Sequence, residues 1–181
     1  MAWNPFKLFR RRDWKTVNTR RIARLRDRGA RIGEGCVIFT DEFSTEPCLI
    51  ELGDRVAVSG GTTFLTHNGS VRMVRRERPR VQNFGRIVVG SGTFIGEKCI
   101  LLPGTFIGAN CLIGAGSVVR GKIPDNSLVF GNPARVVGRA SLALERMLAS
   151  PDSLDTLELT DAERRKILEQ HFGLGGAPQN K

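Results

Sequence analysis

Aliphatic residues recur at every sixth position in the middle of the chain. From residue 89 to residue 124, each block of six opens on Val, Ile or Leu, and glycine follows in four of the six blocks. The fifth position is small in five of the six blocks. The opening residues are Val89, Ile95, Leu101, Ile107, Ile113 and Val119. A fixed period of this kind is the signature of stacked repeats.

A period of six fits neither an α-helix, with about 3.6 residues per turn, nor a long plain strand. It fits a solenoid in which each block adds one short strand to a side wall and points its opening aliphatic residue inward. We expect the glycines at the second position to lie where the chain turns a corner, because glycine accepts backbone angles that cost other residues energy. The chain is therefore predicted to be mainly β.

The repeat begins earlier in the chain and is interrupted twice. Blocks with the same pattern occupy residues 32–37 and 52–63. Between these blocks, and again before residue 89, the spacing of the inward positions is not a multiple of six. The pattern therefore predicts two loops, one around residues 41–47 and a second, protruding loop at about 68–86.

A short helix is predicted before the first block. Asn18 is placed to cap it, Ile22 and Leu25 share one face, and Gly29 stops it after Arg28.

Beyond residue 124 the period fades into a turn-rich capping segment. A helix is expected over residues 141–148, and Thr160 with Glu163 has the spacing of a capping box that opens a helix to about Phe172. The simplest role for both C-terminal helices is to cover the open end of the solenoid, whose strand edges need protection.

The formal charge of +10 is unevenly distributed. Residues 1–31 carry eleven Lys and Arg against two Asp, and residues 71–86 carry six Arg against one Glu. The first 15 residues also interleave Trp and Phe with the basic side chains. This arm either packs on a neighbouring subunit or contacts an anionic membrane from the cytoplasmic side. Nucleic acid is not expected as a partner, because no ordered set of base-stacking residues is evident.

Other classes of protein are disfavoured by what the sequence contains. No apolar run approaches a transmembrane span, and the basic N-terminus lacks the apolar core of a secretory signal. Cys36, Cys99 and Cys111 occupy the small fifth position of their blocks, and the four cysteines show no metal or disulfide spacing. We expect structural thiols in a reducing cytoplasm and no metal.

Only two histidines occur in the chain. His67 is the fourth residue of the block that opens at Phe64, immediately before the basic loop, so its side chain is expected to face outward. His171 lies near the end of the last predicted helix and is either a partner of the helix dipole or simply solvated.

Several motifs together resemble a known family. They are LTHNGS at 65–70, FGRIVVGSGTFIG at 84–96, ILLPGTFIG at 100–108, GAGSVV at 114–119 and IPDNSLVFGNPARVVG at 123–138. Over roughly residues 32–139 the chain resembles the hexapeptide-repeat acetyl-CoA-dependent acetyltransferases, in particular O-acetyltransferases that act on sugars of capsule, lipopolysaccharide or exopolysaccharide. The resemblance implies a left-handed parallel β-helix, acetyl-CoA as co-substrate and a homotrimer with a donor groove between parallel solenoids.

The resemblance also implies roles for particular residues. His67, before the protruding loop, would be the general base that removes a proton from the acceptor hydroxyl. Asn68 and Asn83 could orient His67, bind acceptor hydroxyls or simply form turns, and Arg75 and Arg78 of the loop could face an acidic, nucleotide-linked or lipid-linked saccharide or only solvent. The residues assigned to the phosphates and nucleotide of acetyl-CoA are Arg120, Lys122, Asn132, Pro133, Arg135 and Arg139.

We accordingly divide the chain into a basic aromatic arm with a short helix (1–31), a β-helix acyltransferase domain (32–139) and a C-terminal helical extension with a flexible tail (140–181). A zinc site of the carbonic-anhydrase type is excluded, because it needs three histidines and the repeats contain one. A large helical domain like that of serine acetyltransferases has no room before the first block. An amino-sugar N-acetyltransferase and a non-catalytic β-solenoid scaffold remain alternatives.

Overall fold

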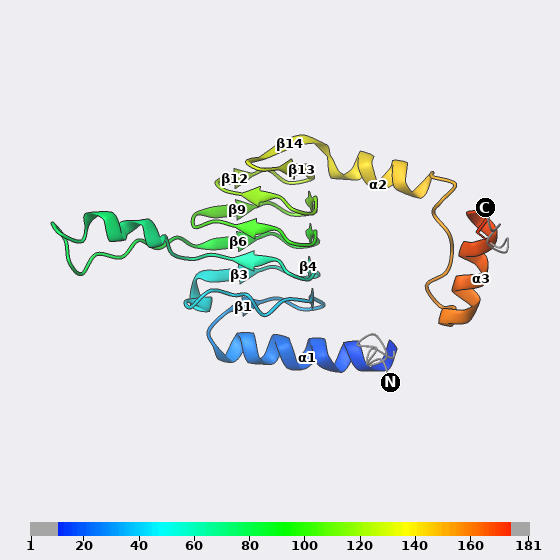
Figure 1. Cartoon of the computed structure of the whole chain (residues 1–181), viewed down its shortest axis with the longest axis horizontal. Coiled ribbons are helices and arrows are strands. Elements are labelled where there is room, and N and C mark those ends of the chain that lie inside the picture. The colour runs from blue at the N-terminus through cyan, green and yellow to red at the C-terminus, as the bar shows by residue number, and fades with distance from the viewer. Residues whose placement is uncertain (1–10, 175–181) are drawn as a thin grey trace, which may run out of the picture. The chain divides into compact units, whose positions relative to one another are not determined.

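A computed structural model describes residues 11–174 and divides the chain into two compact units, Met1–Ala143 and Leu144–Lys181 (Figure 1). The predictions for residues 1–10 of the arm, and for residues 175–181 of the tail, lie outside the described residues.

Short parallel strands in the first unit form three walls, which confirms the solenoid and its mainly β content (Figure 1). The first wall contains β1 (Arg31–Ile32), β3 (Ile50–Leu52), β6 (Ile87–Val89), β9 (Thr105–Ile107) and β12 (Lys122–Ile123). The second contains β2 (Val37–Ile38), β4 (Ala57–Val58), β7 (Phe94–Ile95), β10 (Leu112–Ile113), β13 (Ser127–Gly131) and β14 (Ala134–Arg139). The third contains β5 (Thr63–Phe64), β8 (Ile100–Leu101) and β11 (Val118–Val119).

Successive coils stack in register, so one inward residue lies on the next. On the second wall Val58 pairs with Ile95, which pairs with Ile113. The six opening aliphatic residues are all buried, with at most 3% of their surface exposed, as the period predicted. Burying an aliphatic side chain of this size contributes about 1.5–3 kcal/mol, and the stack repeats that gain in every coil.

The reason given for the second-position glycines was wrong. Gly90, Gly96, Gly108 and Gly114 do not have positive φ. Each is required because atoms of the next coil stand 2.6 Å or less from where a Cβ would be. In five of the six regular blocks the backbone instead takes positive φ at the fourth position, where Gly, Lys and Asn all occur; in the block that opens at Val119 it does so at the third, Gly121. The fourth position, and not the second, makes the turn.

The N-terminal helix is longer than predicted and Asn18 does not cap it. α1 runs over Arg11–Asp27 and places Asn18 in its middle, 8% exposed. The Asn18 side chain donates to Cys36 O (3.0 Å) and accepts from Ile38 N (2.8 Å). Asn18 therefore pairs with the open edge of the first coil, which otherwise has no strand beyond it. The helix ends before Gly29, which has φ +99° as expected of its stop residue.

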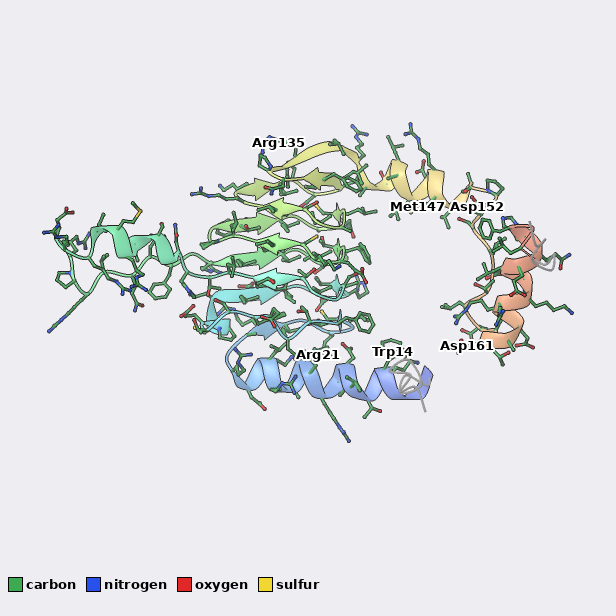
Figure 2. The ribbon with its side chains drawn as sticks, in the orientation of Figure 1. Trp14, Arg21, Arg135, Met147, Asp152 and Asp161 are labelled. Carbon is green, nitrogen blue, oxygen red and sulfur yellow. The ribbon has the colours of Figure 1, made fainter. Side chains whose placement is uncertain are left out.

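The same helix carries an aromatic side chain of the arm onto the first coil. Trp14 and Arg21 lie on α1 (Figure 2). The Trp14 ring is 6.0 Å from the Phe39 ring, and Arg21 Nη1 donates to Ile38 O at 2.8 Å. Trp14 thus packs on its own chain.

The segment after residue 124 is a β-hairpin and not an irregular cap. β13 continues the second wall in parallel with β10, and β14 returns antiparallel to it. The turn between them contains a cis peptide bond between Asn132 and Pro133. The hairpin forms because Val129 still fills an inward position, so one more strand can be added to the wall.

Two helices follow the hairpin. α2 spans Ala140–Leu148, close to the predicted limits, and α3 spans Asp161–His171. Thr160 forms the predicted capping box with Glu163. His171 Nε2 lies 2.8 Å from Asp152 Oδ1, so its partner is a carboxylate. That these helices cover the end of the solenoid stays a prediction. No helix among residues 11–174 is long and apolar enough to cross a membrane.

Candidate active site

His67 lies at the corner that follows the third wall, where the regular turn is replaced. In the blocks that open at Ile95 and Ile107, the fourth residue has positive φ and the chain turns. His67 occupies that position after Phe64 but does not have positive φ; it forms an isolated antiparallel bridge with Phe84. The chain therefore leaves the solenoid at His67 and returns beside it, and the loop holds the histidine at the surface.

Glu46 is the partner of His67. His67 Nδ1 lies 3.1 Å from Glu46 Oε2, and the two side chains are 44% and 28% exposed. The Glu46 carboxylate also accepts from the hydroxyls of Thr45 (2.6 Å) and Thr66 (2.7 Å). These two hydroxyls, followed by His67, lower the pKa of Glu46 to about 2. Glu46 is therefore an anion at any working pH.

An ionised carboxylate only accepts hydrogen bonds, so Nδ1 of His67 carries the proton that faces Glu46. In a neutral imidazole this leaves Nε2 with a free lone pair. The carboxylate thus orients the ring of His67, and the nitrogen on the other side of the ring can accept a proton.

Glu46 was not selected from the sequence, because it lies in the first interruption, where the six-residue spacing of the inward positions is broken. Phe43 forms a bridge with Phe64 and so occupies the third wall of the first coil, with its ring 4.4 Å from the Phe64 ring. Glu46 lies three residues after Phe43, as His67 lies three residues after Phe64. The two are equivalent residues of adjacent coils. Phe43 comes one residue too early for the strict period, which expects position 44, and that shift concealed the match.

Two hollows meet at this corner. One, of about 400 Å³, is lined by Glu46, His67, Arg72, Arg75 and Gln82 among others. The other, of about 280 Å³, is also lined by His67. It shares Asn68, Gly69 and Asn83 with the first, and it adds Leu65, Leu102, Pro103 and Arg120. Both volumes are near the lower end of the range for small-molecule sites, which is about 300–1,000 Å³. His67 belongs to both hollows.

The structure brings together five of the residues selected from the sequence. Asn68 and Asn83 line both hollows, Arg75 lines the larger one and Arg120 the smaller one, all with His67. The Asn68 side chain forms no hydrogen bond with His67. It accepts from Ser70 N (3.0 Å) and caps the 3₁₀-helix η3 (Gly69–Val74), while its backbone N–H donates to Asn83 O (2.9 Å). Asn68 therefore shapes the start of the loop.

The other selected residues lie elsewhere. Arg78 lines a separate hollow with Pro79, Arg80 and Val81 at the far part of the loop. Lys122 lines a shallow site on the first wall with Phe106. The remaining four line neither hollow at His67: Asn132 and Pro133 form the hairpin turn, and Arg135 and Arg139 lie on β14 (Figure 2).

The cysteines contribute to the core. Cys36, Cys99 and Cys111 are at most 5% exposed, and burial raises the pKa of each thiol. Each thiol contacts a backbone carbonyl of another coil, as Cys99 Sγ does with Gly114 O at 3.2 Å. They are structural thiols, as predicted. Among the described residues no group of His, Cys, Asp and Glu could hold a metal ion.

Comparison with known proteins gives consistent matches. Residues 86–121 match the family model "Bacterial transferase hexapeptide (six repeats)". Protein CapG of Staphylococcus aureus is 37% identical over 152 residues, which cover 82% of this chain and 87% of CapG.

Two further proteins match over smaller shares. The dTDP-3-amino-3,6-dideoxy-alpha-D-galactopyranose 3-N-acetyltransferase of Aneurinibacillus thermoaerophilus is 40% identical over 57 residues, which are 32% of this chain and 30% of that protein. A solved maltose O-acetyltransferase from Clostridium difficile 630 is 25% identical, with a TM-score of 0.47 over 64% of this chain and 72% of that one.

Proposed function

The chain belongs to the hexapeptide-repeat transferase family, and on that premise we propose that it is an O-acetyltransferase that moves an acetyl group from acetyl-CoA to a hydroxyl of a saccharide. His67 is the general base. The observation that carries the proposal is the contact of His67 Nδ1 with the Glu46 carboxylate at the junction of two hollows.

The proposed reaction uses His67 Nε2 twice. A sugar hydroxyl is a weak nucleophile at neutral pH, so Nε2 takes its proton as the oxygen attacks the thioester carbonyl. Collapse of the tetrahedral intermediate breaks the carbon–sulfur bond, and the imidazolium returns the proton to the leaving thiolate. The products are the acetyl ester and free CoA. The Glu46 anion stabilises the imidazolium between these steps and keeps Nδ1 protonated throughout.

The smaller hollow suits the donor. Leu65, Leu102 and Pro103 offer apolar surface beside His67, which matches a thioester and the arm that carries it. Arg120 adds one cation within reach of a phosphate or of the oxyanion. Lys122, Arg135 and Arg139, with the hairpin turn, remain candidates for the distal phosphates of acetyl-CoA in the proposed homotrimer. The proposed hand of the solenoid is left, as family membership implies.

N-acetylation of an amino sugar is the second candidate. It is favoured by the 40% identity over 57 residues to an N-acetyltransferase that acts on a dTDP-linked amino sugar. The same base serves both reactions, because an amine also loses a proton on forming an amide. Mild alkali separates the two products, since it hydrolyses an acetyl ester and leaves an acetamide intact.

The test is release of free CoA from acetyl-CoA in the presence of a panel of sugars and amino sugars. His67→Ala should lower kcat by about 10²- to 10⁴-fold, the usual contribution of a general base. His171→Ala is the matched control, because it removes the other histidine, which pairs with Asp152 in the C-terminal unit. Circular dichroism and the melting temperature should match wild type in both variants. Full activity of a folded His67→Ala variant would remove the mechanism, and absence of CoA release with every acceptor would favour the scaffold alternative.

A further inference from the structure

The loop that leaves the solenoid at His67 presents two of its arginines to the larger hollow. The 3₁₀-helix η3 covers Gly69–Val74 and is followed directly by Arg75. With about three residues per turn, positions 69, 72 and 75 share one face. Gly69, Arg72 and Arg75 all line the hollow that contains His67. The local helix type therefore selects Arg72 and Arg75 from the arginines of the loop.

Neither of these arginines is neutralised within the described part of the chain. Arg72 and Arg75 form no ion pair with a carboxylate of residues 14–174. Arg86, at the end of the same loop, is different, since its guanidinium lies 3.1 Å from Glu51 Oε2. Arg86 thus has a carboxylate partner, while the two arginines at the hollow have none among the described residues.

The carboxylate of the hollow itself forms no ion pair with either arginine. Glu46 is the one carboxylate that lines it, and its oxygens already accept from Thr45, Thr66 and His67. Gln82 and Asn83 add neutral amide groups, which suit sugar hydroxyls. The larger hollow thus combines two free cations, polar amides and the histidine.

We infer that the acceptor saccharide carries an anionic substituent, a phosphate or a carboxylate, that binds Arg72 and Arg75 while its reacting hydroxyl faces His67. The inference rests on the proposed function and names the class of its acceptor. Guanidinium groups bind both anions through paired hydrogen bonds, which fixes the orientation of the sugar as well as its affinity. Arg72 and Arg75 are then specificity-determining residues, and a neutral sugar is a poor acceptor.

The phosphates of acetyl-CoA are the competing occupant of these arginines. The lining of the hollows argues against it, because Leu65, Leu102, Pro103 and Arg120 line the smaller hollow and not the larger one. The two assignments differ in a measurable way. Loss of an acceptor site raises KM for the acceptor, whereas loss of a donor site raises KM for acetyl-CoA.

The experiment compares wild type with the double variant Arg72→Gln/Arg75→Gln. The matched control is Arg78→Gln/Arg80→Gln, which removes the same charge from the same loop around a different hollow. The acceptors are glucose, galactose, N-acetylglucosamine and N-acetylgalactosamine, each beside its 1-phosphate, together with glucuronate and galacturonate. Acetyl-CoA is varied in a second series.

In wild type, the best acceptor should be anionic, with kcat/KM at least about tenfold above its neutral counterpart, as charge-assisted hydrogen bonds imply. The variant at 72 and 75 should use the anionic and the neutral sugar about equally well. Its KM for acetyl-CoA should not change, and its kcat/KM for the neutral sugar should change less than about threefold. Preference for the 1-phosphates over the uronates, or the reverse, identifies the anion. The control variant should retain the wild-type ratio.

Three results would overturn the inference. The first is an equal kcat/KM of wild type for neutral and charged sugars. The second is an equal fall in kcat/KM for both kinds of sugar in the variant at 72 and 75. The third is a raised KM of that variant for acetyl-CoA. The first two leave the acetyltransferase itself intact. If no sugar is acetylated, the proposed function fails, and binding of galactose 1-phosphate and galacturonate by calorimetry still decides the anion site. If wild type and the variant at 72 and 75 bind these two ligands with equal affinity, or if neither protein binds them, the inference of an anion site is refuted.

Discussion

The corners that follow the first and the third wall are built differently. After the first four strands of the first wall the second-position residue is Gly33, Gly53, Gly90 or Gly108, and neighbouring atoms stand 2.5 Å or less from where each Cβ would be. After the third wall the same position holds Leu65, Leu102 or Arg120. Both interruptions of the period leave from this third corner. At the first corner, successive coils are in close contact. At the third corner, there is room for the larger side chains that line the candidate site.

The difference shows how a uniform repeat can carry a site. Coils separated by one β-sheet spacing leave no room for a side chain at a tight corner. The third corner has no glycine at the second position of its blocks, and side chains from successive coils line the same hollows there. Glu46, His67, Pro103 and Arg120 come from successive coils and line the two connected hollows. Substitutions in the walls and at the first corner should therefore affect mainly the free energy of unfolding, and those at the third corner should affect mainly kcat.

The largest expected effect on stability comes from the core. Ile95 is fully buried on the second wall, away from the open corner. Ile95→Ala should lower the free energy of unfolding by about 2–5 kcal/mol, through lost burial and the cavity it leaves. Urea unfolding measures the loss. If the walls only support the site, the kcat of Ile95→Ala, measured at a temperature well below its melting temperature, should stay within about twofold of wild type. A drop in kcat comparable with that of His67→Ala would break the separation.

A glycine exchange compares the tight first corner with the start of the loop that leaves the third corner. An alanine Cβ at Gly90 would stand 2.5 Å from the backbone of Gly108 and Ala109, whereas nothing lies within 4 Å of one at Gly69. Gly90→Ala should cost about 1–3 kcal/mol, because the coils must separate to admit the methyl group. Gly69→Ala should stay within about 0.5 kcal/mol. Paired thermal melts of the two variants test this. Equal costs would mean that the first corner is no tighter than the open start of the loop.

The smallest effect is expected at Glu46. Glu46→Gln removes the charge that orients His67, and kcat should fall about tenfold, part of the 10²- to 10⁴-fold contribution of the base. Exposed Glu42, in the same loop, provides the control Glu42→Gln, which should keep wild-type activity. Unchanged kcat in Glu46→Gln would show that His67 does not depend on this carboxylate.

The same variant predicts a pH dependence of stability. The folded state lowers the pKa of Glu46 from 4.5 to about 2, so the ionised form is favoured by folding. Its contribution is complete above about pH 4.5 and is lost as the pH falls toward 2. Urea unfolding at pH 7, 5, 4 and 3 should therefore show wild type and Glu46→Gln converging at the acid end. A constant difference would contradict the assigned cause.

Much of the fold followed from local pattern. The period identified the inward residues and both interruptions, and the capping box placed α3. The errors had a common origin in contacts between distant segments. Asn18 has the residue type of a helix cap but pairs with the edge of a coil formed 18 to 20 residues later. The segment after Pro124 looked irregular because its pairing partner is β10.

The site divides in the same way. The sequence by itself determined that His67 faces outward where the repeat breaks, because six-residue spacing assigns each residue a side of the wall. Only the tertiary structure decided that Glu46, 21 residues away, holds it, and that Arg72 and Arg75 share its hollow while Arg78 does not. The physical reason is that the stacking of coils sets which exposed residues become neighbours. Packing decides the one-residue shift at Phe43 and the short 3₁₀-helix, and neither feature shows in the six-residue period of the sequence.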